Sequence, residues 1–125
     1  MDIAQLEMND TFGVNIVLPD GTETDMVVDV YGIDSPQYKK ASLARQNKAL
    51  KGMKRGKQKD ATAEEIEDRG FEVLVSCTAG WSGFESGGKP LEFNDENVDN
   101  VYRKFSFIKE QVDEAISNRV NFMKR

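Results

Sequence analysis

The chain of 125 residues contains no histidine and a single cysteine, Cys77. Without histidine, Ser-His-Asp and Cys-His catalysis are excluded, and so are zinc sites of the usual Cys/His kind. One cysteine cannot form a disulfide within the chain, which favours a reducing cytoplasm as the compartment. The sequence has no run of about 18 apolar residues, so we expect no transmembrane helix.

Other absences point the same way. Residues 1–7 have neither a basic flank nor an apolar stretch, which argues against a secretory signal. Carboxylates, lysines and tyrosines are not gathered in any recognisable catalytic motif, so we expect no enzyme and no cofactor. With 38% hydrophobic and 31% charged residues, the chain has enough apolar side chains for one modest core, and we expect a single domain over residues 1–125.

Two short segments resemble ligand-binding motifs, but each lacks a residue that the motif requires. Residues 94–100 are rich in Asp and Asn but lack the glycine that a calcium loop needs at its sharp turn. Residues 83–89 have the glycine and lysine spacing of a phosphate-binding P-loop. However, Pro90 stands where a hydroxyl should bind magnesium. We therefore expect neither a metal nor a nucleotide.

What the chain does have is charge in blocks. Residues 1–38 contain eight acidic and no basic side chains, and residues 60–125 contain fourteen acidic and eight basic ones. Between them, residues 39–59 contain nine basic and no acidic side chains. The nine are Lys39, Lys40, Arg45, Lys48, Lys51, Lys54, Arg55, Lys57 and Lys59. Such a block is either a solvated face or an interaction segment.

Exposed ion pairs are individually weak, so we favour contact with a partner over pairing within the chain. We predict that Lys48, Lys51, Lys54 and Arg55 bind an anionic partner or a second copy of the chain, which keeps self-association open. The alternative is a small nucleic-acid-binding protein that uses residues 39–59. We rank it second because this segment lacks base-stacking aromatics and the rest of the chain is acidic.

Residues 12–31 predict a β-hairpin. Apolar residues alternate on both sides of turn segment 19–22: Val14, Ile16 and Leu18 before it, and Met26, Val28 and Val30 after it. A lone hairpin is marginally stable in water, so it must pack on helices. We therefore expect an α+β fold, with an N-terminal β-hairpin packed on a mainly helical part of about four helices over residues 36–125.

The first helix is expected to begin at Pro36 after a cap at Ser35 and to run into the basic block. Gly52 and Gly56 weaken its far end by about 1 kcal/mol each relative to alanine, so we expect a mobile basic segment near residues 52–60. Thr62 and Glu65 form a capping box for a second helix ending at Gly80. A short strand over residues 71–75 is the alternative there.

Two further helices are expected, one capped by Asn94 and one opened by Ser106. The residues expected to point inward are Ile66, Val73, Leu74 and Cys77 in the second helix, Val98, Val101, Tyr102 and Phe105 in the third, and Ile108, Val112, Ala115, Ile116 and Val120 in the last.

Four glycines and Pro90 predict a loop over residues 80–93. A solvated linker has no use for the indole of Trp81 or the ring of Phe84. Either these rings pin the loop to the body, or they are presented to a partner.

The order of these features resembles the tail assembly chaperones of long-tailed (siphovirus-type) bacteriophages. The resemblance covers most of residues 12–123. It rests on Gly32-Ile33-Asp34-Ser35, Trp81-Ser82-Gly83 and Leu91-Glu92-Phe93-Asn94.

The resemblance implies a non-enzymatic protein that keeps the tape measure protein soluble and helps to bring tail tube subunits to it. It also implies a protein of the host cell cytoplasm that is absent from the mature virion. On this basis the apolar loop with Trp81 and Phe84 and the basic block become candidate client-binding regions.

Overall fold

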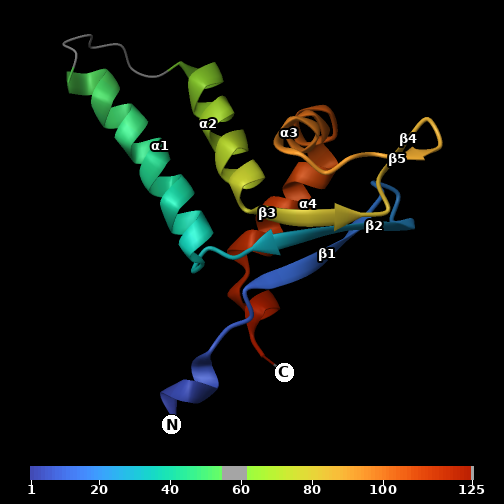
Figure 1. Ribbon diagram of the computed structural model, residues 1–125, viewed down its shortest axis with the longest axis horizontal. Coiled ribbons are helices and arrows are strands. Elements are labelled where there is room, and N and C mark those ends of the chain that lie inside the picture. Colours follow the sequence, from blue (N-terminus) through green and yellow to red (C-terminus); the bar gives the residue numbers. More distant parts are fainter. Residues whose placement is uncertain (55–61, 125) are drawn as a thin grey trace.

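A computed structural model describes residues 1–54 and 62–124, with side chains placed for residues 1–47 and 62–124. The fold is α+β, as predicted: a three-stranded antiparallel sheet is combined with four α-helices in this part of the chain (Figure 1). In chain order the elements are η1 (Ile3–Leu6), β1 (Thr11–Val17), β2 (Glu23–Tyr31), α1 (Pro36–Lys54), α2 (Ala63–Ser76), β3 (Thr78–Ser82), β4 (Glu85–Ser86), β5 (Lys89–Pro90), α3 (Asp95–Lys104), α4 (Ser106–Ser117) and η2 (Arg119–Phe122).

The predicted hairpin is confirmed. β1 and β2 pair antiparallel from Thr11↔Tyr31 to Val17↔Glu23, with a bulge between Asn15 and Val17. Gly21 has φ +90° in the connecting turn, a conformation that glycine adopts without steric cost.

The hairpin is part of a larger sheet, because the region after α2 was predicted wrongly. The second helix was expected to reach Gly80, but it ends at Ser76, and Thr78–Ser82 forms a third strand on the free side of β2. The Thr78 hydroxyl donates to the carbonyl of Leu74 at 2.8 Å, which closes the last turn of α2 as the chain enters β3. Residues 78–82 form a strand because they pair with the backbone of β2, and no local pattern in residues 76–82 predicts this pairing.

The alternative strand over residues 71–75 is also wrong, because these residues are helical. Gly80 and Trp81 therefore belong to a strand, and only the segment after Ser82 is a connection. That connection contains the two-residue strands β4 and β5.

The helix starts follow the predicted caps. Ser35 Oγ accepts from the amide of Tyr38 at 3.1 Å, Thr62 Oγ1 from that of Glu65 at 3.1 Å, and Asn94 Oδ1 from that of Asn97 at 2.8 Å. α1 extends to Lys54, two residues past Gly52. Residues 55–60 of the segment expected to be mobile lie outside the described residues.

The core lies between one face of the sheet and the helices that cover it. Val28 and Val30 of β2 and Ile16 of β1 are fully buried, and α4 packs against both strands. Most residues predicted to point inward do so: Val73, Leu74, Cys77, Val98, Val101, Tyr102, Ile108, Val112, Ala115 and Ile116 are buried.

Three residues predicted to point inward are exposed instead: Ile66 (49%), Phe105 (38%) and Val120 (52%). Ile66 lies near the start of α2, on the part of the helix that extends away from the sheet. Phe105 interrupts the helical path between α3 and α4, with φ −117° and ψ 83°, so its side chain leaves the inner face. Val120 falls in η2, after α4 has ended at Ser117, and the helical periodicity no longer applies there.

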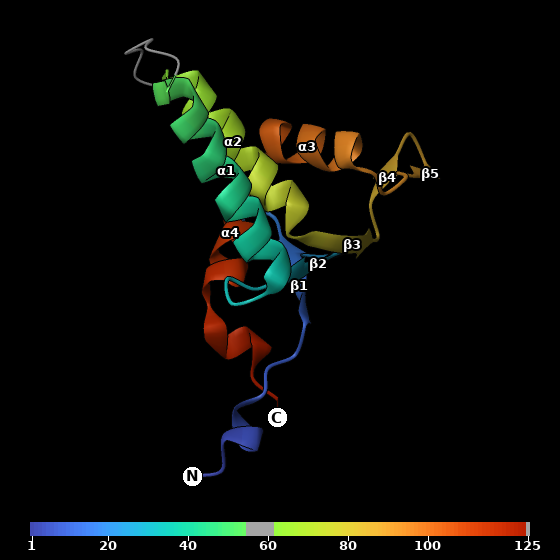
Figure 2. The same ribbon diagram turned by 60° about the vertical axis from the view of Figure 1, so that its left-hand side comes forward.

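Helices α1 and α2 form an antiparallel pair that projects from the body, here called the arm (Figures 1 and 2). Its base packs on the core through Tyr38 and Ala41 of α1 and Phe71 and Leu74 of α2. Its far end extends beyond the layer formed by the sheet, α3 and α4 (Figure 2).

Gly83 sets the path of the chain after β3. Its φ is +76°, and a Cβ atom there would overlap the carbonyl group of Asp25 on β2. Gly88 has almost the same φ, +79°, but a Cβ atom there would meet nothing within 4 Å. The two glycines thus share a positive φ and differ in steric surroundings.

Alanine substitution at these two glycines separates the loss of stability caused by a positive φ from the loss caused by a steric clash with β2. We expect Gly88→Ala to lower the free energy of unfolding by about 1 kcal/mol, the ordinary penalty for positive φ. Gly83→Ala should cost at least about 3 kcal/mol, because the strand or the loop must shift as well. Urea unfolding of both variants measures the difference, and equal losses would contradict the close approach.

Candidate partner-binding surfaces

Trp81 contacts two aromatic rings and one backbone carbonyl of the segment that follows it. It points to the core face of the sheet, opposite Val28. Its ring stacks on Phe84 with centroids 4.4 Å apart and planes 17° from parallel, and it meets Phe93 edge-on at 5.6 Å. The indole Nε1 donates to the carbonyl of Leu91 at 3.1 Å. These contacts pin the connection between β3 and α3 to the sheet.

The same geometry limits what this segment presents to a partner. Phe84 is 7% exposed and Trp81 is half-buried. The amide of Leu91 donates to the carbonyl of Phe84 at 2.8 Å, which ties the two ends of the β4–β5 hairpin together. Because the Phe84 ring is buried, the structure favours Phe93, 38% exposed, as the accessible member of this aromatic cluster.

The basic candidates lie elsewhere. Lys48, Lys51 and Lys54 belong to α1, but their side chains are outside the described residues, as is the whole of Arg55. The structure thus describes no contact of these four side chains, and their predicted role as client contacts stays a prediction.

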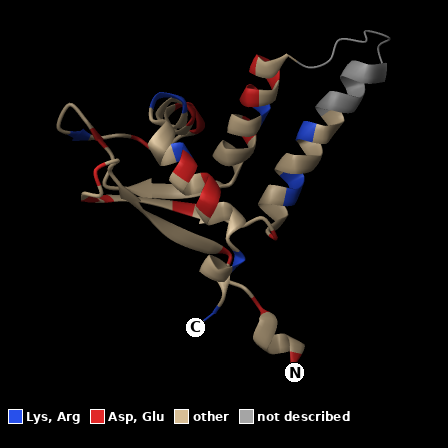
Figure 3. Ribbon diagram, turned by 180° about the vertical axis from the view of Figure 1, so that it is seen from behind, with Lys and Arg blue, Asp and Glu red and all other residues tan. Residues whose placement is uncertain are grey.

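The two helices of the arm carry opposite charges in their described parts. Lys39, Lys40 and Arg45 of α1 are exposed, and α2 begins with an acidic turn that contains Glu64 and Glu65 (Figure 3). Acidic residues in the first turn suit the partial positive charge at a helix N-terminus. Between the charges, Leu43 of α1 is 57% exposed and Ile66 of α2 is 49% exposed. The arm thus offers apolar side chains within a strongly charged surface.

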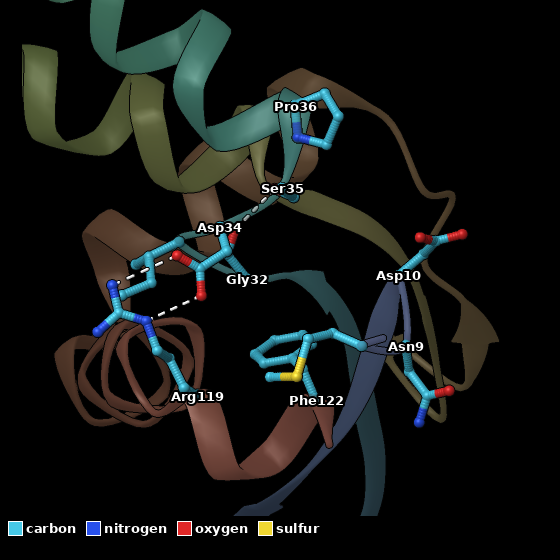
Figure 4. A pocket seen from close by; sticks show the side chains of 10 residues that line it. Asn9, Asp10, Gly32, Asp34, Ser35, Pro36, Arg119 and Phe122 are labelled. Carbon is cyan, nitrogen blue, oxygen red and sulfur yellow. Dashed lines mark hydrogen bonds and ion pairs between the residues drawn. The ribbon is translucent and has the colours of Figure 1, made fainter. Parts of the chain in front are cut away.

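A small cavity of about 160 Å³ lies at the junction of β2, α1 and η2 (Figure 4). Arg119 of η2 holds both carboxylate oxygens of Asp34 at 2.8 and 3.3 Å beside it. Gly32 forms part of its wall, where a Cβ atom would lie 2.9 Å from the ring of Phe122. The hydrogen bond from Arg119 lowers the pKa of Asp34, and the same bond raises the pKa of Arg119.

Two hydrogen bonds beside this cavity hold the turn from β2 into α1. The Ser35 hydroxyl donates to the carbonyl of Gly32 at 2.6 Å, and the amide of Ile33 donates to Ile116 at 3.2 Å. The turn from β2 into α1 is thereby fastened to the C-terminal helix. No sequence signal identifies the Asp34–Arg119 pair, since 85 residues separate its members.

The described residues offer little reactive chemistry. Among them, no group of three or more Cys, Asp or Glu side chains is placed to hold a metal ion. Burial raises the pKa of the Cys77 thiol to about 11 and that of Tyr102 to about 12. The Tyr102 hydroxyl shares a 2.6 Å hydrogen bond with Thr78, so it belongs to the packing of α3 on the start of β3. Within the described ranges, no helix is long and apolar enough to cross a bilayer.

Comparison with known proteins gives no match: no family model, curated protein or solved structure is similar to this chain. The resemblance to tail assembly chaperones therefore rests on its motif residues. In the structure these occupy junctions: residues 32–35 turn from β2 into α1, residues 81–83 leave β3, and residues 91–94 lead into the cap of α3. Their positions explain why these short motifs carry particular residue types, whatever the function.

Truncation of Trp81 tests whether it anchors the loop. We expect Trp81→Ala to lower the free energy of unfolding by about 3 kcal/mol, because it removes a stacked, hydrogen-bonded ring. Phe105→Ala is the matched control: this exposed ring should cost about 1 kcal/mol or less. Thermal and urea unfolding provide the measurement. If Trp81→Ala were as stable as the control, anchoring would be wrong.

The raised pKa values of Cys77 and Tyr102 predict alkaline sensitivity. Folding favours the protonated forms, so their contribution to stability is complete below pH about 9 and is lost as pH rises through about 11 to 12. We expect the free energy of unfolding to fall as pH rises from about 9 to about 12, and Cys77→Ala to reduce that slope. Iodoacetamide should label native Cys77 only at the rate of unfolding. Rapid labelling of the folded protein would contradict the burial.

Proposed function

We propose that this protein is a tail assembly chaperone of a long-tailed bacteriophage. In this role it binds the tape measure protein, keeps it soluble in the host cell cytoplasm and helps to recruit tail tube protein. It is then absent from the mature virion. The role requires binding alone, and no catalytic step is assigned to any residue.

The observation that carries the proposal is the arm. A tape measure protein is largely helical and apolar, so it needs apolar surface against which a helix can pack. Leu43 and Ile66 offer such surface on the two helices of the arm, whose far end extends beyond the body (Figure 2). The surrounding charges keep the arm, and a complex formed on it, in solution.

The basic residues of α1 extend this interaction by charge. Lys39, Lys40 and Arg45 are exposed on the described part of α1, and the sequence adds further basic residues toward its end. These basic side chains can pair with acidic stretches of the client or of a second copy of this chain. In a second copy, residues 1–38 carry eight acidic side chains.

Coexpression with the candidate tape measure protein tests the proposal. The wild-type chain should make this client soluble and copurify with it. Leu43→Ser together with Ile66→Ser should keep the fold, since both side chains are about half exposed. The pair should reduce client recovery by about tenfold. Val120→Ser, equally exposed but on η2, is the control and should leave recovery unchanged.

A charge-reversed variant separates client binding from nucleic-acid binding. We expect Lys48, Lys51, Lys54 and Arg55, all changed to Glu, to weaken client binding most at low salt, where charge steering is strongest. Client binding that does not change at low salt would rule out the steering role. If the wild-type chain instead bound DNA with a steep salt dependence and left the client insoluble, the nucleic-acid alternative would replace the proposal.

A further inference from the structure

β1 is an outer strand of the sheet, whose order is β1-β2-β3. In Figure 1 it runs along the lower margin of the sheet. An outer strand carries backbone N–H and C=O groups on its far side that are available to another extended chain.

The hydrogen bonds settle the direction. The amide of Tyr31 donates to the carbonyl of Cys77 on the β3 side at 2.8 Å, so the backbone groups of Tyr31 point away from β1, and those of its partner Thr11 point away from β2. Groups of odd-numbered residues face away, because the direction alternates along a strand. Two contacts agree with this assignment: Val17 and Asn9 both bond to groups outside the hairpin.

Both ends of this outer edge are occupied by the chain itself. At one end, the Gln111 side chain of α4 bonds both backbone groups of Val17, donating to its carbonyl at 2.8 Å and accepting from its amide at 2.9 Å. At the other end, the amide of Asn9 donates to the carbonyl of Phe122 at 2.7 Å, and Met8 forms an antiparallel bridge with Met123. Thr11, Gly13 and Asn15 lie between these contacts with their backbone groups directed outward.

The surroundings of this open stretch differ on the two faces of the sheet. On the core face, an open hollow of about 560 Å³ is lined by Phe12, Asn121, Met123 and Asn9. The ring of Phe12 and the thioether of Met123 make this hollow suitable for apolar side chains. On the opposite face, a Cβ atom at Gly13 would lie 3.3 Å from Oδ1 of Asp29. The Asp29 carboxylate therefore lies beside bare backbone, within reach of a cation on a neighbouring strand.

We propose that the outer edge of β1 is a strand-addition site for an extended segment of a partner protein, in which apolar residues alternate with lysine or arginine. The added strand pairs with Thr11, Gly13 and Asn15, continuing the row that Met123 begins. Its apolar side chains enter the hollow beside Phe12. Its cationic side chain opposite Gly13 meets Asp29. This inference is independent of the proposed chaperone role and of the arm.

The test uses the full-length protein and a synthetic peptide of about seven residues that alternates lysine and valine. Backbone amide signals of Thr11, Gly13 and Asn15 should shift on titration, and their hydrogen exchange should slow. Asp29→Asn should weaken binding by about three- to tenfold. A matched peptide with glutamate in place of lysine should not bind.

Asn15→Pro removes an outward N–H that has no acceptor among the described residues, and proline is tolerated at such edge positions. It should reduce binding by about tenfold or more, whereas Asn15→Ala, which keeps the amide, should bind like the wild type. If Asn15→Pro unfolds, methylation of alternate peptide amides tests the same bonds on the wild-type protein.

Three results would overturn the proposal. The first is no shift at Thr11, Gly13 and Asn15 when the peptide is at millimolar concentration. The second is equal affinity of the Asn15→Pro variant or of the methylated peptide. The third is a wild-type dimer in sedimentation that Asn15→Pro abolishes, because the edge would then be occupied by a second copy of this chain.

Discussion

The structure depends on β2 being the central strand of the sheet. It pairs with β1 on one side and β3 on the other, and its Val28 and Val30 side chains are completely buried. A two-stranded hairpin would be marginal in water, whereas three strands with one face covered by a helix form a stable unit. The addition of β3 also moves Trp81 onto the core face and fixes the point from which α2 and the following loop leave the sheet.

From this centre the molecule divides into a closely packed body and a projecting arm. Long-range contacts hold the body together: the Trp81 cluster and Gly83 fasten the connection to α3, Gln111 bonds the end of β1, and Arg119 ties η2 to Asp34. The arm is attached at its base and carries exposed apolar and charged side chains beyond it. Binding surfaces with few internal contacts are compatible with a stable fold only when another region supplies the stability.

The two proposed interaction surfaces use different physical principles. The arm offers side chains to a helical client, so its selectivity comes from apolar shape and charge. The edge of β1 offers backbone hydrogen bonds to an extended chain, so its selectivity comes from the alternation of side chains on the two faces. Gln111 and Phe122 already occupy both ends of that edge, so within the described part of the chain a short stretch is open, which limits uncontrolled strand pairing.

The sequence by itself determined the elements whose signals are local: the hairpin, the caps at Ser35, Thr62 and Asn94, and the inward faces of the helices in the body. Only the tertiary structure decided that Thr78–Ser82 is a strand, because its pairing partner lies about fifty residues earlier on β2. The exposure of Ile66 and Phe105, the anchoring of Trp81 and the open edge of β1 were likewise decided by contacts between distant segments, which periodicity and capping do not encode.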